Sequence, residues 1–164
     1  MTKKFIKPVP MLIAGLVVGI VIRLLDIYTS VLGPMFSQAA VWMLICTVIS
    51  VYSETKWKAM INVLFFCLAM LTTYYAMAVL THGVYGKAYI IGWTVFAFAT
   101  PVMAYFAWLT KENGVLPKII SACIVIGAFF SSVIFFHGPK FYDYIIDAVL
   151  IWFLFFKKVD RAKA

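Results

Sequence analysis

Two aspartates inside the last apolar segment have the clearest chemical potential in this chain. The segment reads FYDYIIDAVLIWFLFF from Phe141 to Phe156, and it contains Asp143 and Asp147. An ionised carboxylate at the centre of a membrane helix costs about 2.5 to 3.5 kcal/mol on insertion scales. The rest of the chain must therefore supply a partner, a water-filled cavity or a proton. Such carboxylates can serve as a site for a ligand or a proton.

Other polar residues fall at a similar depth in their own apolar segments. At a rise of 1.5 Å per helical residue, Arg23 and Asp143 both lie about 21 Å from the side on which the chain begins. Asp147 lies one turn deeper, near the middle of the membrane. The predicted ligand-binding residues are Arg23, Asp26, Gln38, Thr72, Tyr75, Asp143 and Asp147. Because they share one layer displaced from the middle of the membrane, we expect a polar pocket that opens to the outside.

Arg23 shares one helical face with two glycines and a third aspartate. Gly15, Gly19, Arg23 and Asp26 follow one another at spacings of four, four and three residues. The Gly15-x-x-x-Gly19 pair is a small-residue motif that lets two membrane helices approach closely. This face is therefore predicted to lie inside the bundle or against a partner subunit.

Two interpretations of the charges remain open. Arg23 could pair with Asp143 or Asp147 and simply join the first helix to the last. Alternatively, Arg23 and the aspartates line a pocket, and one carboxylate is left for a ligand or a proton. A single guanidinium cannot neutralise every carboxylate, which slightly favours the second interpretation. The sequence does not say whether a small-molecule ligand is cationic, but the excess of carboxylate over arginine leans that way.

These residues must be positioned by membrane helices. Apolar residues make up 65% of the chain and charged residues 12%, whereas soluble domains carry about 25% charged residues. The sequence predicts an all-α integral membrane bundle of six transmembrane helices that forms a single domain over residues 1–164. The predicted spans are residues 9–27, 31–52, 59–81, 88–109, 119–136 and 141–156.

The basic residues predict how the bundle lies in the membrane. Eleven of the fourteen Lys and Arg residues fall on the side that holds the N-terminus, and only Arg23, Lys87 and Lys140 fall on the other. By the positive-inside rule, both termini are expected to be cytoplasmic in a multi-pass protein of the cell membrane. The net charge of +8 is then explained by the lipid bilayer as the partner, without a nucleic acid.

Enzymatic and metal chemistry are not indicated. No hydrolase, zinc-protease, phosphate-loop or CxxC motif is present. Cys46, Cys67 and Cys123 lie on three different apolar segments, and free cysteines usually behave as small buried hydrophobes. We therefore expect neither catalytic activity nor a metal or other cofactor.

Two resemblances add to this picture. The segments GPMFSQAAVWMLICTVIS (residues 33–50) and FCLAMLTTYYAMAVL (residues 66–80) resemble an uncharacterised family of small bacterial membrane proteins, a domain of unknown function. That resemblance implies a bacterial membrane protein and no particular activity. The six-helix arrangement is also similar to the substrate-binding S components of energy-coupling-factor transporters. This similarity implies an outward-facing pocket and a first helix that docks on a scaffold subunit, although Gly15 and Gly19 stand where alanines would be expected.

Two functions are consistent with these features. The first is a small-solute binding or transport component that uses the outward-facing polar pocket. The alternative is a non-transporting assembly or interaction subunit that docks on a partner membrane subunit through the Gly15/Gly19 face.

Overall fold

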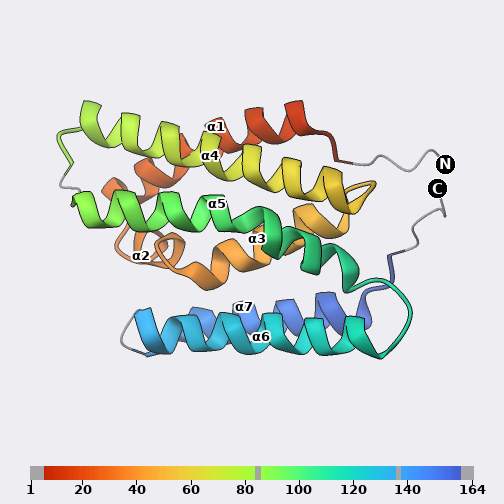
Figure 1. Ribbon diagram of the computed structural model, residues 1–164. Helices are drawn as coiled ribbons and strands as arrows, with labels where there is room; N and C mark the ends of the chain where they lie inside the picture. Colours follow the sequence, from red (N-terminus) through yellow and green to blue (C-terminus); the bar gives the residue numbers. More distant parts are fainter. Residues whose placement is uncertain (1–5, 84–85, 136–137, 160–164) are drawn as a thin grey trace.

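The computed structural model describes residues 6–83, 86–135 and 138–159, and these residues form helices without a strand (Figure 1). The helices are α1 (Pro8–Tyr28), α2 (Leu32–Phe36), α3 (Ala39–Val51), α4 (Lys56–Leu80), α5 (Lys87–Leu109), α6 (Val115–Phe135) and α7 (Phe141–Ile151). A short π-helix, η1 (Trp152–Phe156), continues α7. The predicted all-α class is confirmed for the described residues.

Four helices in the described part of the chain are long and apolar enough to cross a membrane. They are α1, α4, α5 and α6, with 21 to 25 residues and mean hydropathies between 1.6 and 2.3. About 20 apolar residues are needed to cross the hydrocarbon core of a bilayer. Many large apolar side chains on their outer faces are exposed, as a lipid-facing surface requires. The chain is therefore a membrane protein.

The predicted second span, residues 31–52, is broken into two helices. α2 has 5 residues and α3 has 13, and Gln38 between them is extended, with φ −91° and ψ 142°. The Trp42 indole N–H donates to the Phe36 carbonyl oxygen at 2.8 Å across this break. Backbone that leaves helical geometry inside a membrane needs such replacement partners, because lipid offers none.

The helices run alternately between two ends of the bundle, and hydrogen bonds hold one end together. Near the start of α1, the Ile6 carbonyl oxygen accepts from the Asn62 amide at 3.1 Å. Lys111, just after α5, donates to the Leu154 carbonyl oxygen at 2.8 Å. We call this end the basic end and the opposite one the far end. The described lysines at the basic end are Lys7, Lys56, Lys58, Lys111, Lys118, Lys157 and Lys158.

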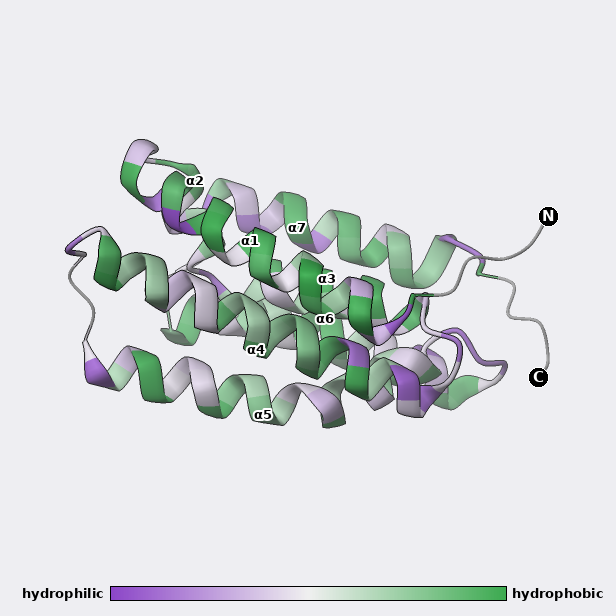
Figure 2. Cartoon of the chain, turned by 90° about the horizontal axis from the view of Figure 1, so that it is seen from above, coloured by the Kyte–Doolittle hydropathy of each residue, from purple (hydrophilic) through white to green (hydrophobic). Residues whose placement is uncertain are grey.

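Two apolar clusters form the interior, and α3 contributes to both. The first cluster joins α1, α3, α4 and α5 around Val63 and Phe66. The second joins α3, α6 and α7 around Ala128 and Leu150. Viewed from above, hydrophobic turns fill the middle of the long helices and hydrophilic residues gather near their ends (Figure 2). α3 is thus the common wall between an α1/α4/α5 group and an α6/α7 group.

α1 and α4 approach each other backbone to backbone. Gly15 and Gly19 are buried, and a Cβ atom on either would overlap a carbonyl oxygen of α4, that of Phe66 or that of Met70 respectively. The Gly15/Gly19 face therefore lies inside the bundle. α4 covers it and leaves no room there for a partner subunit.

Candidate functional site

Asp143 sits at the start of α7 in a fully buried hydrogen-bond network. Its carboxylate accepts from the Lys140 backbone N–H at 2.7 Å. We assign the Gln38 amide from its neighbours. In this orientation its nitrogen donates to both carboxylate oxygens, at 2.6 and 3.0 Å, and its oxygen accepts from the Tyr142 hydroxyl at 3.0 Å. The break between α2 and α3 is what brings Gln38 to this carboxylate.

Asp147 lies one helical turn closer to the basic end on the same face of α7. The residue is 8% exposed, and its Oδ1 atom has no hydrogen-bond partner among the described residues. Ile146 and Leu150, its neighbours on this face, belong to the apolar cluster shared with α3 and α6. The two carboxylates of α7 therefore differ in their hydrogen bonds: Asp143 accepts from the Gln38 amide and the Lys140 N–H, whereas the Oδ1 atom of Asp147 has no donor among the described residues.

Arg23 belongs to a separate cluster at the far end of α1 and α4. Its guanidinium forms an ion pair with Asp26 at 3.1 Å and donates from Nε to the Thr81 hydroxyl at 3.0 Å. The Tyr74 hydroxyl donates to the same Asp26 carboxylate at 2.8 Å. We call Arg23, Asp26, Tyr74 and Thr81 the arginine cluster. It ties the end of α1 to the end of α4.

Arg23 pairs with Asp26, so the open alternative in which it pairs with Asp143 or Asp147 is not what the structure shows. α1 packs mainly on α4, whereas α7 packs on α3 and α6 on the other side of the bundle (Figure 1). The predicted depths of Arg23 and Asp143 agree with the structure, because both residues lie near the far end of the bundle. Depth alone does not say which helices are neighbours, and the i,i+3 carboxylate of Asp26 was already within reach of the guanidinium.

The single polar layer expected from the sequence is thus divided into two parts. Gln38, Asp143 and Asp147 lie at α7, and we call them the α7 site. Arg23 and Asp26 lie on α1. Thr72 is exposed on α4 and donates to the Leu68 carbonyl oxygen of its own helix at 2.8 Å, and Tyr75 is half-buried on the same helix beside Tyr74. α4 packs mainly on α1 and α5, so these two residues are not part of the α7 site.

Several participants were not among the predicted site residues. They are Tyr142 and the Lys140 N–H at the α7 site, and Tyr74 and Thr81 in the arginine cluster. Tyr74 is adjacent in the sequence to Tyr75, a predicted site residue, and therefore lies at nearly the same depth. The backbone donor of Lys140 carries no side-chain signal, and only the helix start at Phe141 reveals it.

The three cysteines lie on three different helices, as predicted, but only two of them are buried. Cys46 and Cys67 are buried with their sulfur atoms 3.7 Å apart, across α3 and α4. Cys123, in contrast, is exposed on α6. Within the described residues no group of three or more His, Cys, Asp or Glu side chains could hold a metal ion.

Residues 2–155 match DUF6518, a family of unknown function. The chain belongs to this family. The predicted membership of an uncharacterised family is thereby confirmed, and the family supplies no activity. No curated protein and no solved structure matches the chain, so the similarity to S components of energy-coupling-factor transporters stays a prediction.

A double-mutant cycle tests the partner of Arg23. We expect Arg23→Leu and Asp26→Leu to be coupled by about 1 kcal/mol or more in the free energy of unfolding, because they share a largely buried, charged hydrogen bond. Arg23→Leu and Asp143→Leu should be additive within about 0.5 kcal/mol, because separated sites do not interact. Unfolding in detergent, followed by circular dichroism, supplies both numbers. Coupling to Asp143 instead of Asp26 would mean that α1 packs against α7.

Proposed function

We propose that this protein is a small-solute binding or transport component of the membrane, and that the carboxylates of α7 bind a proton or a small cation. The observation that carries the proposal is Asp147, which is buried inside a membrane bundle and whose Oδ1 atom has no hydrogen-bond donor in the described part of the chain. Ionisable groups at such positions are costly, and in membrane proteins they mark ion pathways and proton relays.

The surroundings of Asp147 support a binding role over a structural one. Asp143 is already held by the Gln38 amide and a backbone N–H, so the fold does not need a second carboxyl group for this contact. A leucine at position 147 would suit the neighbouring apolar cluster better. We therefore expect the carboxyl group of Asp147 to lower the stability of the bundle without a contact that offsets this loss. This is the pattern expected of a residue kept for binding.

The broken helix α2/α3 is a second supporting feature. Transporters often place interrupted helices at their binding sites, because the unwound backbone offers polar groups inside the membrane. Here the interruption falls at Gln38, which contacts Asp143. The alternative function, an assembly subunit that docks through Gly15 and Gly19, is less well supported because α4 occupies that face.

For the topology, we propose that the chain crosses the membrane six times with both termini in the cytoplasm. α2 and α3 together, and α7 with η1, would make the two further crossings. The lysines at the basic end support this orientation, because cytoplasmic loops carry an excess of Lys and Arg. Asp143, about 20 Å from the inner end of η1, would then lie in the half of the bilayer away from the cytoplasm, and Asp147 would lie near the middle.

Reporter fusions test this topology. A reporter fused after Lys87 should report the side opposite to the cytoplasm, and one fused after Lys158 should report the cytoplasm. Alkaline phosphatase and green fluorescent protein fusions provide complementary readings, because each is active on only one side. Two fusions that report the same side would contradict the six-crossing arrangement.

Carbodiimide labelling tests the binding site. Dicyclohexylcarbodiimide is apolar, enters membranes and forms a stable N-acylurea with a protonated carboxyl group that water does not reach. We expect it to label the peptide that contains Asp147. Deprotonation of the Asp147 carboxyl group at higher pH, or a cation bound to it, should slow the labelling. Purified protein would be labelled over a range of pH and with added Li⁺, Na⁺ or K⁺, and adducts located by mass spectrometry.

Two variants make the labelling specific. Asp147→Asn should lose the adduct, whereas Asp26→Asn should keep it, because Asp26 lies in the arginine cluster. Labelling at Asp147 that responds to neither pH nor any cation would contradict a proton or cation site. Absence of labelling in the wild-type protein at every pH would contradict it as well.

A further inference from the structure

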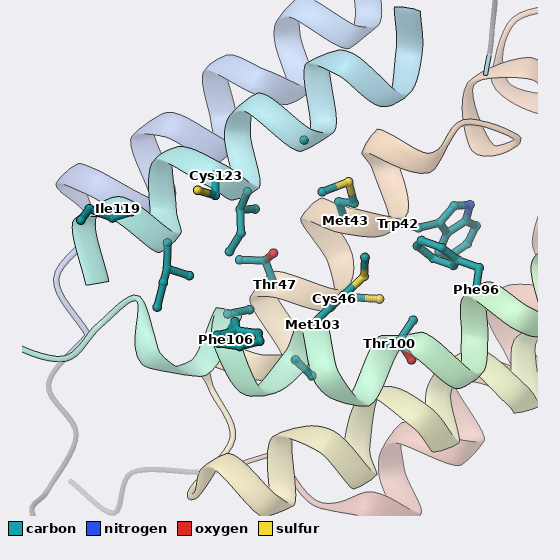
Figure 3. A pocket seen from close by; sticks show the side chains of 15 residues that line it. Trp42, Met43, Cys46, Thr47, Phe96, Thr100, Met103, Phe106, Ile119 and Cys123 are labelled. Atoms are coloured by element: carbon teal, nitrogen blue, oxygen red, sulfur yellow. The ribbon is translucent and has the colours of Figure 1, made fainter. Parts of the chain in front are cut away.

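An apolar cleft runs between α5 and α6, and α3 forms its floor. Its volume is about 380 Å³, within the range of ligand pockets. Residues from all three helices line it (Figure 3), among them Cys46, Thr47, Thr100, Met103, Cys123 and Gly127. None of the α7 site residues is among the lining residues, so the cleft is a second and separate feature of the molecule.

The cleft exists because α5 and α6 belong to different halves of the bundle. α5 packs mainly on α4, and α6 on α7 and α3, so these two consecutive helices make few contacts with each other. Small residues at the cleft, such as Ala104, Ala107 and Gly127, leave the space between the helices unfilled. Protein interiors are normally packed without voids of this size. We therefore expect a molecule from the surroundings to occupy the cleft.

The apolar lining of the cleft favours a lipid acyl chain as its occupant. Met103, Phe106 and Ile119 on the rim are 47%, 47% and 54% exposed, so the cleft opens on the lipid-facing surface of the bundle. The Thr100 hydroxyl is already satisfied, because it donates to the Ala97 carbonyl oxygen at 2.6 Å. A water molecule needs two to four polar partners to stay in a cavity, and this lining offers few.

Charges at one end of the cleft indicate which lipid. Ile119 and Ala107 line the part nearest the basic end. Lys111 lies in the turn between α5 and α6 there, and Lys118 lies near the start of α6, next to Ile119 in the sequence. Lys111 also donates to the carbonyl oxygen of Lys157, so a third lysine lies close by. Glu112 is the acidic residue in this turn, and the surplus of positive charge suits an anionic headgroup.

We propose that the cleft binds one acyl chain of an anionic phospholipid from the leaflet at the basic end, with the headgroup beside Lys118. The acyl chain lies along α3 between α5 and α6, and the phosphate stays at the membrane surface. This site does not depend on the proposed cation site of α7. The small residues on the cleft wall would also suit a transmembrane helix of another protein, and the experiment below distinguishes that occupant from a lipid.

Native mass spectrometry of the purified protein tests the proposal. After detergent delipidation, phosphatidylglycerol and phosphatidylcholine of equal chain length are added in turn. We expect a single phosphatidylglycerol to be retained in preference to phosphatidylcholine. Lys118→Gln should reduce that preference about fivefold, because one basic residue near the surface contributes about 1 kcal/mol. The acyl chain should remain bound in this variant.

Tryptophan substitutions at two exposed positions of α6, one that lines the cleft and one that does not, form a matched pair. Cys123→Trp places a large side chain in the cleft and should abolish retention of the lipid. Ile126→Trp places the same side chain on α6 at a position that is exposed but does not line the cleft, and it should leave retention unchanged. Both residues are exposed, so neither change is expected to unfold the protein, and circular dichroism checks that.

Three results would overturn the proposal. The first is a wild-type protein that retains no lipid or retains both lipids equally. The second is an equal loss in Cys123→Trp and Ile126→Trp. The third is a second protein chain, in place of lipid, that co-purifies with the wild type and is lost only in Cys123→Trp.

Discussion

Asp147→Leu is expected to stabilise the protein while it abolishes carbodiimide labelling and cation binding. Asp147 is a buried residue of α7, and its Oδ1 atom has no donor among the described residues. Placing an aspartate at the centre of a membrane helix costs about 2.5 to 3.5 kcal/mol. Removing it should recover a substantial part of that cost, which a rise in the unfolding midpoint in detergent would reveal.

The matched control is the same substitution one turn away. Asp143→Leu removes the acceptor of the Gln38 amide and of the Lys140 N–H. Each buried donor left without an acceptor costs about 1 to 3 kcal/mol, so this variant should be clearly destabilised. The two substitutions remove the same group from the same helix, and we expect their effects on the unfolding midpoint to have opposite signs.

The sign of the Asp147→Leu effect decides what that carboxyl group does. A stabilised variant that no longer binds cations would mean that the carboxyl group is retained for function at the expense of stability. If Asp147→Leu destabilised the protein as much as Asp143→Leu, then Asp147 would have a structural partner. The proposed cation site would then lose the observation on which it rests.

A double variant, Gly15→Leu with Gly19→Leu, is expected to separate α1 from α4. Overpacking of a well-packed interface costs about 1 to 3 kcal/mol per site. Here the new side chains would meet the backbone carbonyl oxygens of Phe66 and Met70, which cannot rotate away as a side chain can. We expect a large loss of stability in thermal unfolding and an expanded or aggregated species in size-exclusion chromatography.

Gly92→Leu is the control for this pair. Gly92 lies in the membrane helix α5, and nothing is within 4 Å of the position that its Cβ atom would take. Its replacement should leave the unfolding temperature unchanged or raise it, since glycine is unfavourable inside a helix. A stable Gly15/Gly19 double variant that lost only a protein partner would instead mean that α1 docks on another chain.

The sequence by itself determined the chemical class of the molecule and the depth of its polar residues. Apolar composition over long segments predicts membrane helices, and the lysines mark the basic end. The helical rise placed Gln38 and Asp143 at similar distances from that end, and the structure joins them by hydrogen bonds. The four-residue spacing of Gly15 and Gly19 identified the face on which α1 packs closely. Each inference used only properties of a single helix.

Only the tertiary structure decided which helices meet. A soluble helix marks its buried face by contrast with a polar one, but a membrane helix is apolar on both its lipid-facing and its protein-facing sides. The sequence therefore does not indicate which side of α7 faces the other helices. The pairing of Arg23 with Asp143 or Asp147 stayed an open alternative, and the structure shows that Asp26 is the partner of Arg23 and Gln38 the partner of Asp143. The break at Gln38 and the cleft between α5 and α6 were hidden for the same physical reason: both depend on how apolar surfaces fit together in three dimensions, and apolar composition does not encode that fit residue by residue.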